Sequence, residues 1–166
     1  MGEYRFSLHV AAPPEQVFDL WVDLDRAPEW IGGLTAITDR VGTPGSTGAR
    51  YVSRFGPMRS PTEVLAAERP RHIRTKFGNW VLRGENEATF TPEGDGTRIE
   101  LTFRTTGIIS AITARMFATG SYDGSFRGEL EHFARIAEAE ATSAVVKASD
   151  AKRAEANAAP SQTPPA

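Results

Sequence analysis

A long apolar stripe near the C-terminus constrains the fold of this chain more than any other feature. Within residues 107–141, an apolar residue recurs at every third or fourth position, which is the spacing of one helix face. This face comprises Ile108, Ile112, Met116, Thr119, Asp123, Phe126, Leu130, Phe133 and Ala137. All of these side chains suit a core except Asp123. The pattern predicts a C-terminal helix that is partly core and partly the wall of a cavity.

Length and composition are those of an ordinary globular domain. The chain has 166 residues, 40% of them hydrophobic and 24% charged, and a formal net charge of −2. Nothing in this charge balance favours nucleic acid or an anionic membrane as a partner. The absence of cysteine excludes disulfides and thiolate chemistry, and it fits the cytoplasm, where we expect the protein to act.

Neither end of the chain has the pattern of a membrane segment. Residues 1–10 alternate in polarity, so we expect no signal peptide there, and no stretch approaches the ~20 apolar residues needed to cross a bilayer. From residue 142 to residue 166 the chain is rich in Ala, Ser and Pro and has no aromatic residue. We expect a frayed helix to about Ala159, followed by a disordered tail.

Alternating polarity predicts a run of strands between two helical regions. The first strand contains Tyr4, Phe6, Leu8 and Val10, and a helix with a weak N-terminal cap follows from Pro13. After a short helical turn at residues 29–31, further strands are predicted at 34–41, 49–55, 60–69, 72–77, 82–91 and 98–105. This order predicts an α+β fold. A seven-stranded antiparallel sheet would curve around the C-terminal helix, with two short helices between the first two strands.

Several sequence segments resemble a known superfamily. They are Ala11–Trp21, Asp23–Trp30, Glu68–Ile73, Phe90–Arg98 and Glu129–Phe133. Together with the order of elements, they resemble the START-like superfamily, also called the helix-grip or birch-pollen-allergen-like fold. Within it, residues 3–141 are most similar to the bacterial polyketide cyclase/dehydrase and lipid-transport family. The resemblance implies a ligand-binding domain over residues 1–141 that holds a hydrophobic molecule between sheet and helix, and it supplies no universal catalytic residue.

The predicted inward positions form a candidate binding site. Aromatic residues dominate them, with a few hydroxyls between, as is typical of small-molecule pockets. The set comprises Phe6, Tyr51, Ser53, Phe55, Thr75, Phe77, Phe90, Phe103, Thr105, Met116, Thr119, Tyr122 and Phe126. The same aromatic residues could instead fill a dry core. The inward hydroxyls favour a cavity, because a buried hydroxyl without a partner costs roughly 1–3 kcal/mol.

Asp123 is the only candidate for a catalytic residue. If the helix is continuous, its carboxylate faces the pocket, where burial would raise its pKa toward that of a general acid or base. Gly120, Gly124 and Gly128 weaken a helix by about 1 kcal/mol each relative to alanine, however. The helix could therefore break here, with Asp123 as the N-cap of a helix starting near Gly124.

The sequence lacks the motifs of other common enzyme classes. There is no nucleophile elbow and no phosphate-binding loop, and His9, His72 and His132 lack the spacing of metal ligands. We therefore predict no metal and no cofactor. The favoured function is binding or carriage of a hydrophobic small molecule such as a lipid, polyketide, quinone or isoprenoid. The alternatives are a polyketide cyclase or aromatase that uses acid–base catalysis in the same cavity, and a protein that acts through protein contacts of its tail.

Overall fold

The computed structural model of the chain describes residues 2–78, 83–106 and 121–158. The elements are β1 (Gly2–Val10), α1 (Pro14–Val22), the 3-10 helix η1 (Ala27–Glu29), β2 (Ala36–Val41), β3 (Arg50–Phe55), β4 (Met58–Glu68), β5 (His72–Gly78), β6 (Arg83–Glu93), β7 (Gly96–Thr106) and α3 (Ser121–Ala158). This order confirms the predicted α+β fold, including the two short helices between the first two strands.

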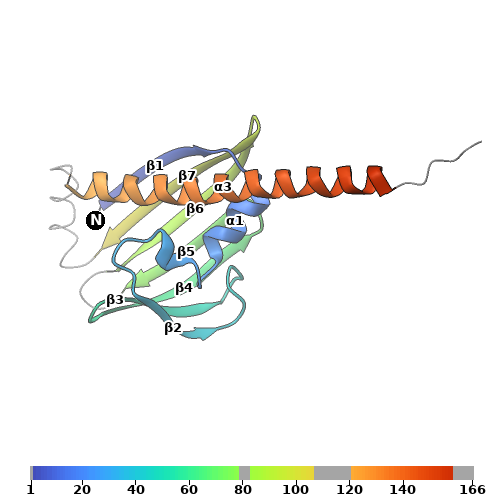
Figure 1. The fold of residues 1–166 in the computed structure, drawn as a ribbon. Coiled ribbons are helices and arrows are strands. Elements are labelled where there is room, and N and C mark those ends of the chain that lie inside the picture. The colour runs from blue at the N-terminus through green and yellow to red at the C-terminus, as the bar shows by residue number, and fades with distance from the viewer. Residues whose placement is uncertain (1, 79–82, 107–120, 159–166) are drawn as a thin grey trace, which may run out of the picture.

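The strands form one antiparallel sheet in the order β1-β7-β6-β5-β4-β3-β2. Consecutive strands from β2 to β7 are neighbours, and β1 closes the sheet against β7. Figure 1 shows the sheet curving, with α3 laid across one of its faces and α1 beside that helix.

Side-chain alternation gives the sheet one buried and one exposed face. In β1, Phe6 and Val10 are buried, whereas Glu3, Arg5 and His9 are exposed. The cross-strand register carries this pattern through the sheet, because residues paired directly opposite one another share a face. The inner face therefore holds the core, as the alternation in the sequence predicted.

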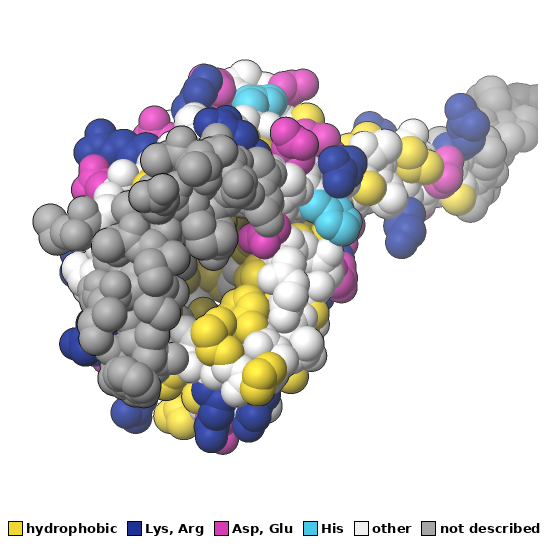
Figure 2. Space-filling view, turned by 90° about the vertical axis from the view of Figure 1, so that its left-hand side faces the viewer, with side chains coloured by type: hydrophobic (Ala, Val, Ile, Leu, Met, Phe, Trp, Pro, Cys, Tyr) yellow, Lys and Arg dark blue, Asp and Glu magenta, His cyan; other side chains and the backbone are white. Residues whose placement is uncertain are grey.

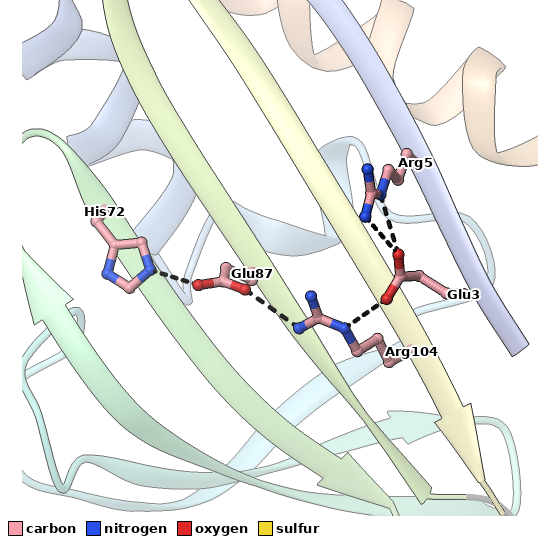
Figure 3. A network of polar contacts seen from close by, with 5 residues as sticks. All are labelled: Glu3, Arg5, His72, Glu87 and Arg104. Atoms are coloured by element: carbon pink, nitrogen blue, oxygen red, sulfur yellow. Dashed lines mark hydrogen bonds and ion pairs between the residues drawn. The ribbon is translucent and has the colours of Figure 1, made fainter. Parts of the chain in front are cut away.

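The outer face carries a row of alternating charges. Paired residues in neighbouring strands make up the row, which runs through Arg50, Glu63, Lys76, Glu85, Arg104 and Glu3. Part of it is the polar network in Figure 3, where Arg104 Nε donates to Glu3 over 2.9 Å and its Nη1 donates to Glu87 over 3.2 Å. These pairs are exposed to solvent, so each contributes little to the stability of the sheet.

Two helical segments, α3 and the α1–η1 region, cover the inner face. The α3 helix contacts β1, and α1 contacts β6, β7 and α3. Polar contacts hold the α1–η1 region against α3. Arg26 forms an ion pair of 2.5 Å with Glu140, and the Gly32 N–H donates to Glu129 over 3.0 Å. The covering layer of α1 and η1 is thus fixed to the C-terminal helix.

The described part of the C-terminal helix runs from Ser121 without a break at Gly124 or Gly128. Asp123 therefore lies within the helix and is not the N-cap of a helix starting near Gly124, whereas Gly120 lies outside the described residues. The helix continues past residue 141 to Ala158, and Figure 1 shows this second half projecting beyond the sheet. Val145 and Val146 are exposed there. Within the described ranges, no helix has the length and apolarity to cross a membrane.

Candidate functional site

A cavity lies between the inner face of the sheet and the α1–η1 layer. Its volume is about 120 Å³. Most of its described lining is apolar, and it comprises Trp21, Val22, Leu24, Ala27, Trp30, Ile31, Ile37, Gly45, Tyr51, Ser53, Val64, Ile73, Thr75, Asn86 and Ala88. Figure 2, seen from the end where α3 begins, shows a hollow that contains hydrophobic side chains. We expected the cavity between the sheet and the C-terminal helix, but its described roof is the layer formed by α1 and η1.

Aromatic packing fixes the roof of this cavity. The ring centroids of Trp21 and Trp30 are 5.1 Å apart, and each meets Phe133 of α3 edge-on at 5.2 and 5.0 Å. Phe133 is fully buried. Since such edge contacts are favourable and directional, α3 sets the position of both indole rings.

Several residues of the lining carry polar groups. Trp30 Nε1 and Asn86 Oδ1 are buried and have no hydrogen-bond partner among the described residues. Burial raises the pKa of Tyr51 to about 12, against the opposing effect of its hydrogen bond with the Thr62 side chain. Tyr51 therefore stays protonated at neutral pH and is a poor general base.

Three of the predicted site residues line the cavity. Tyr51 and Ser53 extend from β3, and Thr75 extends from β5. Phe90, also predicted, is buried next to this region and packs edge-on against Phe18 at 5.4 Å and Trp21 at 5.7 Å.

Other predicted residues lie in a second aromatic cluster beneath α3. Phe6 stacks on Phe126 at 5.0 Å, Phe103 stacks on Phe77 at 5.4 Å, and Phe103 also contacts Phe126 at 5.7 Å. Thr105 is buried on the same face of β7, two residues after Phe103. In this part of the fold the aromatic rings pack against one another, as in a core.

The remaining predicted residues are elsewhere or are not described. Phe55 is half-buried at the end of β3, near Gly33. Met116 and Thr119 lie outside the described residues. Tyr122 and Asp123 belong to α3, but their side chains lie outside the described part of the structure.

Glu129 joins α3 to the loop that follows η1. Its carboxylate accepts the Gly32 N–H, and burial raises its pKa above the ordinary value for a glutamate, with the hydrogen bond acting in the opposite direction. Trp30 and Ile31, which precede Gly32, line the cavity. The contact therefore helps to hold the cavity wall in place.

A larger depression of about 1080 Å³ opens on the outer face of the sheet. Its lining includes the charge row, in which Lys76 and Glu63 form an ion pair of 2.8 Å. Paired charges of this kind are typical of a solvated surface. The inner cavity is the better candidate site because its lining is mostly apolar with a few polar residues.

Sequence reasoning missed several lining residues. Asn86 lies on the inner face of β6, opposite Thr75, which was predicted to point inward. A polar residue at an inward position was the signal that could have identified it. Trp30 lies between η1 and the following loop, and only the structure shows that it lines a cavity. No group of three or more His, Asp or Glu side chains in the described ranges is placed to bind a metal.

Solved structures share this fold. Protein TTHA0849 from Thermus thermophilus is 22% identical, and the match has a TM-score of 0.61 and covers 84% of this chain and 99% of that one. CalU16 from Micromonospora echinospora is 16% identical, with a TM-score of 0.53 and coverage of 85% and 86%. DynU16, a protein in the dynemicin biosynthetic locus, is 20% identical with a TM-score of 0.59; the match covers 80% of this chain but only 46% of DynU16.

A family model covers most of the chain, whereas no curated protein matches it significantly. The matching model is that of polyketide cyclase / dehydrase and lipid transport, and it spans residues 1–138. That span contains the sheet, the α1–η1 layer and the part of α3 that packs on them. The chain therefore belongs to the polyketide cyclase / dehydrase and lipid transport family.

Proposed function

We propose that the protein binds a hydrophobic small molecule, no larger than one small ring, in the cavity between the sheet and the α1–η1 layer. The observation that carries the proposal is a mostly apolar cavity of about 120 Å³ inside the fold, with a few polar groups in its wall. An apolar protein cavity of about 150 Å³ binds benzene, so a cavity of about 120 Å³ limits the ligand to about that size. The family, whose description includes lipid transport as well as cyclases and dehydrases, supports a hydrophobic ligand.

Binding or carriage is favoured over acid–base catalysis by the chemistry of the wall. Tyr51 is the only titratable side chain in the described lining, and its raised pKa leaves it protonated at neutral pH. A cyclase mechanism needs a group whose pKa lies near the working pH. Asp123 was the strongest candidate for that role from the sequence, and its side chain lies outside the described part of the structure.

A cavity-filling substitution tests the proposal. Thr75 is half-buried and lines the cavity, so Thr75→Phe should occupy much of the space. Thr91→Phe is the matched control, since Thr91 is an exposed residue of β6. Ser53→Met fills the same cavity from β3 and serves as a second test if Thr75→Phe does not fold.

Native mass spectrometry of the protein purified from its own host should detect a retained small molecule. A titration with benzene, followed by ligand-observed NMR, should detect binding to the wild type and to Thr91→Phe. Binding should be at least tenfold weaker in Thr75→Phe. The proposal is overturned if the wild type binds no apolar single-ring compound, or if Thr75→Phe and Ser53→Met, folded by circular dichroism, bind as well as the wild type.

A further inference from the structure

The second half of α3 is not covered by the described part of the chain. Ala141 is the last residue of the helix that packs against the core, and every residue from 142 to 155 is exposed. Figure 1 shows this part of α3 projecting beyond the sheet. Residues 142–158 extend over about 26 Å, because a helix rises 1.5 Å per residue. The projecting segment is therefore long enough to form an interface of its own.

Two adjacent valines lie in the middle of this segment. Val145 is 69% exposed and Val146 is 54% exposed. Valine is less favourable than alanine in a helix, because its branched side chain restricts the rotamers that fit. In contact with water alone, the pair would thus add nothing to the stability of the helix. A partner that covers both side chains would gain their apolar surface.

The residues around the valines form one face of the helix. Side chains three or four positions apart lie on the same side of a helix, and this spacing connects Glu138 to Arg153 through the two valines. The Thr142 hydroxyl already donates to the Glu138 carbonyl over 2.9 Å, so it can be covered without losing a hydrogen bond. We call this set the valine face, and it comprises Glu138, Thr142, Val145, Val146, Ser149 and Arg153.

We infer that the valine face binds the same face of a second copy of this chain, with the two helices antiparallel. The twofold axis passes between Val145 and Val146, so that Val145 of each copy meets Val146 of the other. Thr142 then lies opposite Ser149, and Glu138 lies opposite Arg153. This inference goes beyond ligand binding and does not depend on it.

The charges of the face determine the orientation. Glu138 precedes Val145 by as many positions as Arg153 follows Val146. An antiparallel pair therefore brings Glu138 of each copy to Arg153 of the other, whereas a parallel pair in register would place like charges against each other. The Ala11 N–H donates to one oxygen of the Glu138 carboxylate over 2.9 Å, and a carboxylate has the capacity to accept from a guanidinium as well.

The antiparallel arrangement also leaves room for both folded domains. Leu130, Phe133 and Ala137, which pack on the core, lie on a different side of α3 from the valine face. The two domains would lie at opposite ends of the helix pair, which overlaps over residues 133–158 for about 39 Å. A single helix pair is a small interface, so we expect a dissociation constant in the micromolar range.

Sedimentation velocity over a range of protein concentrations tests the inference on the full chain. The double substitution Val145→Ser with Val146→Ser removes the apolar centre and keeps a similar helix propensity, and it should weaken the dimer at least tenfold. Arg153→Glu should weaken it by a similar factor, because two glutamates then face each other twice. The matched control is Lys147→Glu, which makes the same change in net charge at an exposed position outside the valine face and should change the dissociation constant by less than about twofold.

Cross-linking tests the orientation, since the chain has no cysteine of its own. A mixture of the Thr142→Cys and Ser149→Cys variants should be linked by a short thiol-reactive cross-linker, whereas neither variant should be linked to itself. Efficient self-linking of Thr142→Cys would show a parallel pair and overturn the inference. It is also overturned if the wild type stays monomeric at 500 µM, which would leave the face to a different partner, or if the serine and glutamate variants, helical by circular dichroism, dimerise as well as the wild type.

Discussion

Phe133 connects α3 to the roof of the cavity, and Phe133→Leu should therefore affect both stability and binding. The ring is fully buried and meets Trp21 and Trp30 edge-on, at interplanar angles of 79° and 68°. Each such pair is worth about 0.5–1.5 kcal/mol beyond the area that it buries. Leucine keeps much of the apolar volume, and the remaining void costs about 1 kcal/mol more. The expected loss in the free energy of unfolding is therefore about 3 kcal/mol.

Urea denaturation followed by tryptophan fluorescence measures this loss directly. A chain of 166 residues loses about 2–4 °C of Tm for each kcal/mol, so thermal unfolding should shift downward by on the order of 10 °C. Binding of a cavity ligand should weaken as well, because Trp30 is no longer held by Phe133.

Phe6→Leu is the matched control for this prediction. Phe6 is also buried, but among the described residues its aromatic and cation–π partners are only Phe126, in a stacked pair, and the Arg127 guanidinium, 5.8 Å from its centroid. It should lose about 1–2 kcal/mol of stability and keep its affinity for the cavity ligand. The reasoning is refuted if Phe133→Leu is no less stable than Phe6→Leu, or if both substitutions weaken binding equally.

Two further substitutions test the contacts that position the roof. Thr97→Val removes the buried hydrogen bond of 2.7 Å from the Thr97 hydroxyl to the Ala12 carbonyl, and it should lower the free energy of unfolding by about 1–3 kcal/mol. The exposed control Thr91→Val should change the free energy of unfolding by less than about 0.5 kcal/mol. Equal urea midpoints for the two variants would contradict this prediction. Glu129→Gln should stabilise the protein at pH 7. The pKa of the Glu129 carboxyl is raised in the folded state, so the wild-type protein loses stability as the pH rises and this buried group becomes charged, whereas glutamine stays neutral. The gain should disappear as the pH falls below the ordinary glutamate value, where the folded and unfolded carboxyls are both protonated, and a gain independent of pH would show that burial of the charge beside Gly32 is not its cause.

The sequence predicted the fold because its signals are local. Alternation in β1 correctly placed Phe6 and Val10 inward, and the apolar stripe correctly identified Phe133 as a core residue. The glycines near Asp123 left open whether the last helix breaks. Within the described residues the helix continues through Gly124 and Gly128, since packing of one helix face outweighs the intrinsic cost of these two glycines.

The location of the cavity could not be predicted in the same way. Periodicity shows which face a side chain occupies, but not which partner it meets. Phe103 and Thr75 are both on the inner face, yet Phe103 packs into an aromatic cluster and Thr75 lines the cavity. The difference depends on where α1 and η1 fold back over the sheet. That position is fixed by contacts such as the ion pair of Arg26 with Glu140, two residues that are more than a hundred positions apart in the sequence.

The width of the sheet explains why the cavity lies beneath the α1–η1 layer. Seven strands at a spacing of about 4.8 Å extend about 29 Å, whereas one helix with its side chains is about 10–12 Å across. The α3 helix can therefore cover the β1–β7 side but not the whole inner face. Among the described residues, the other side is covered by a short helix, a single 3-10 turn and a loop, in which Gly45 lies against Val22. Such irregular segments cannot fill space as densely as a long regular helix, so the unfilled volume remains beneath them, between Trp30 and Asn86.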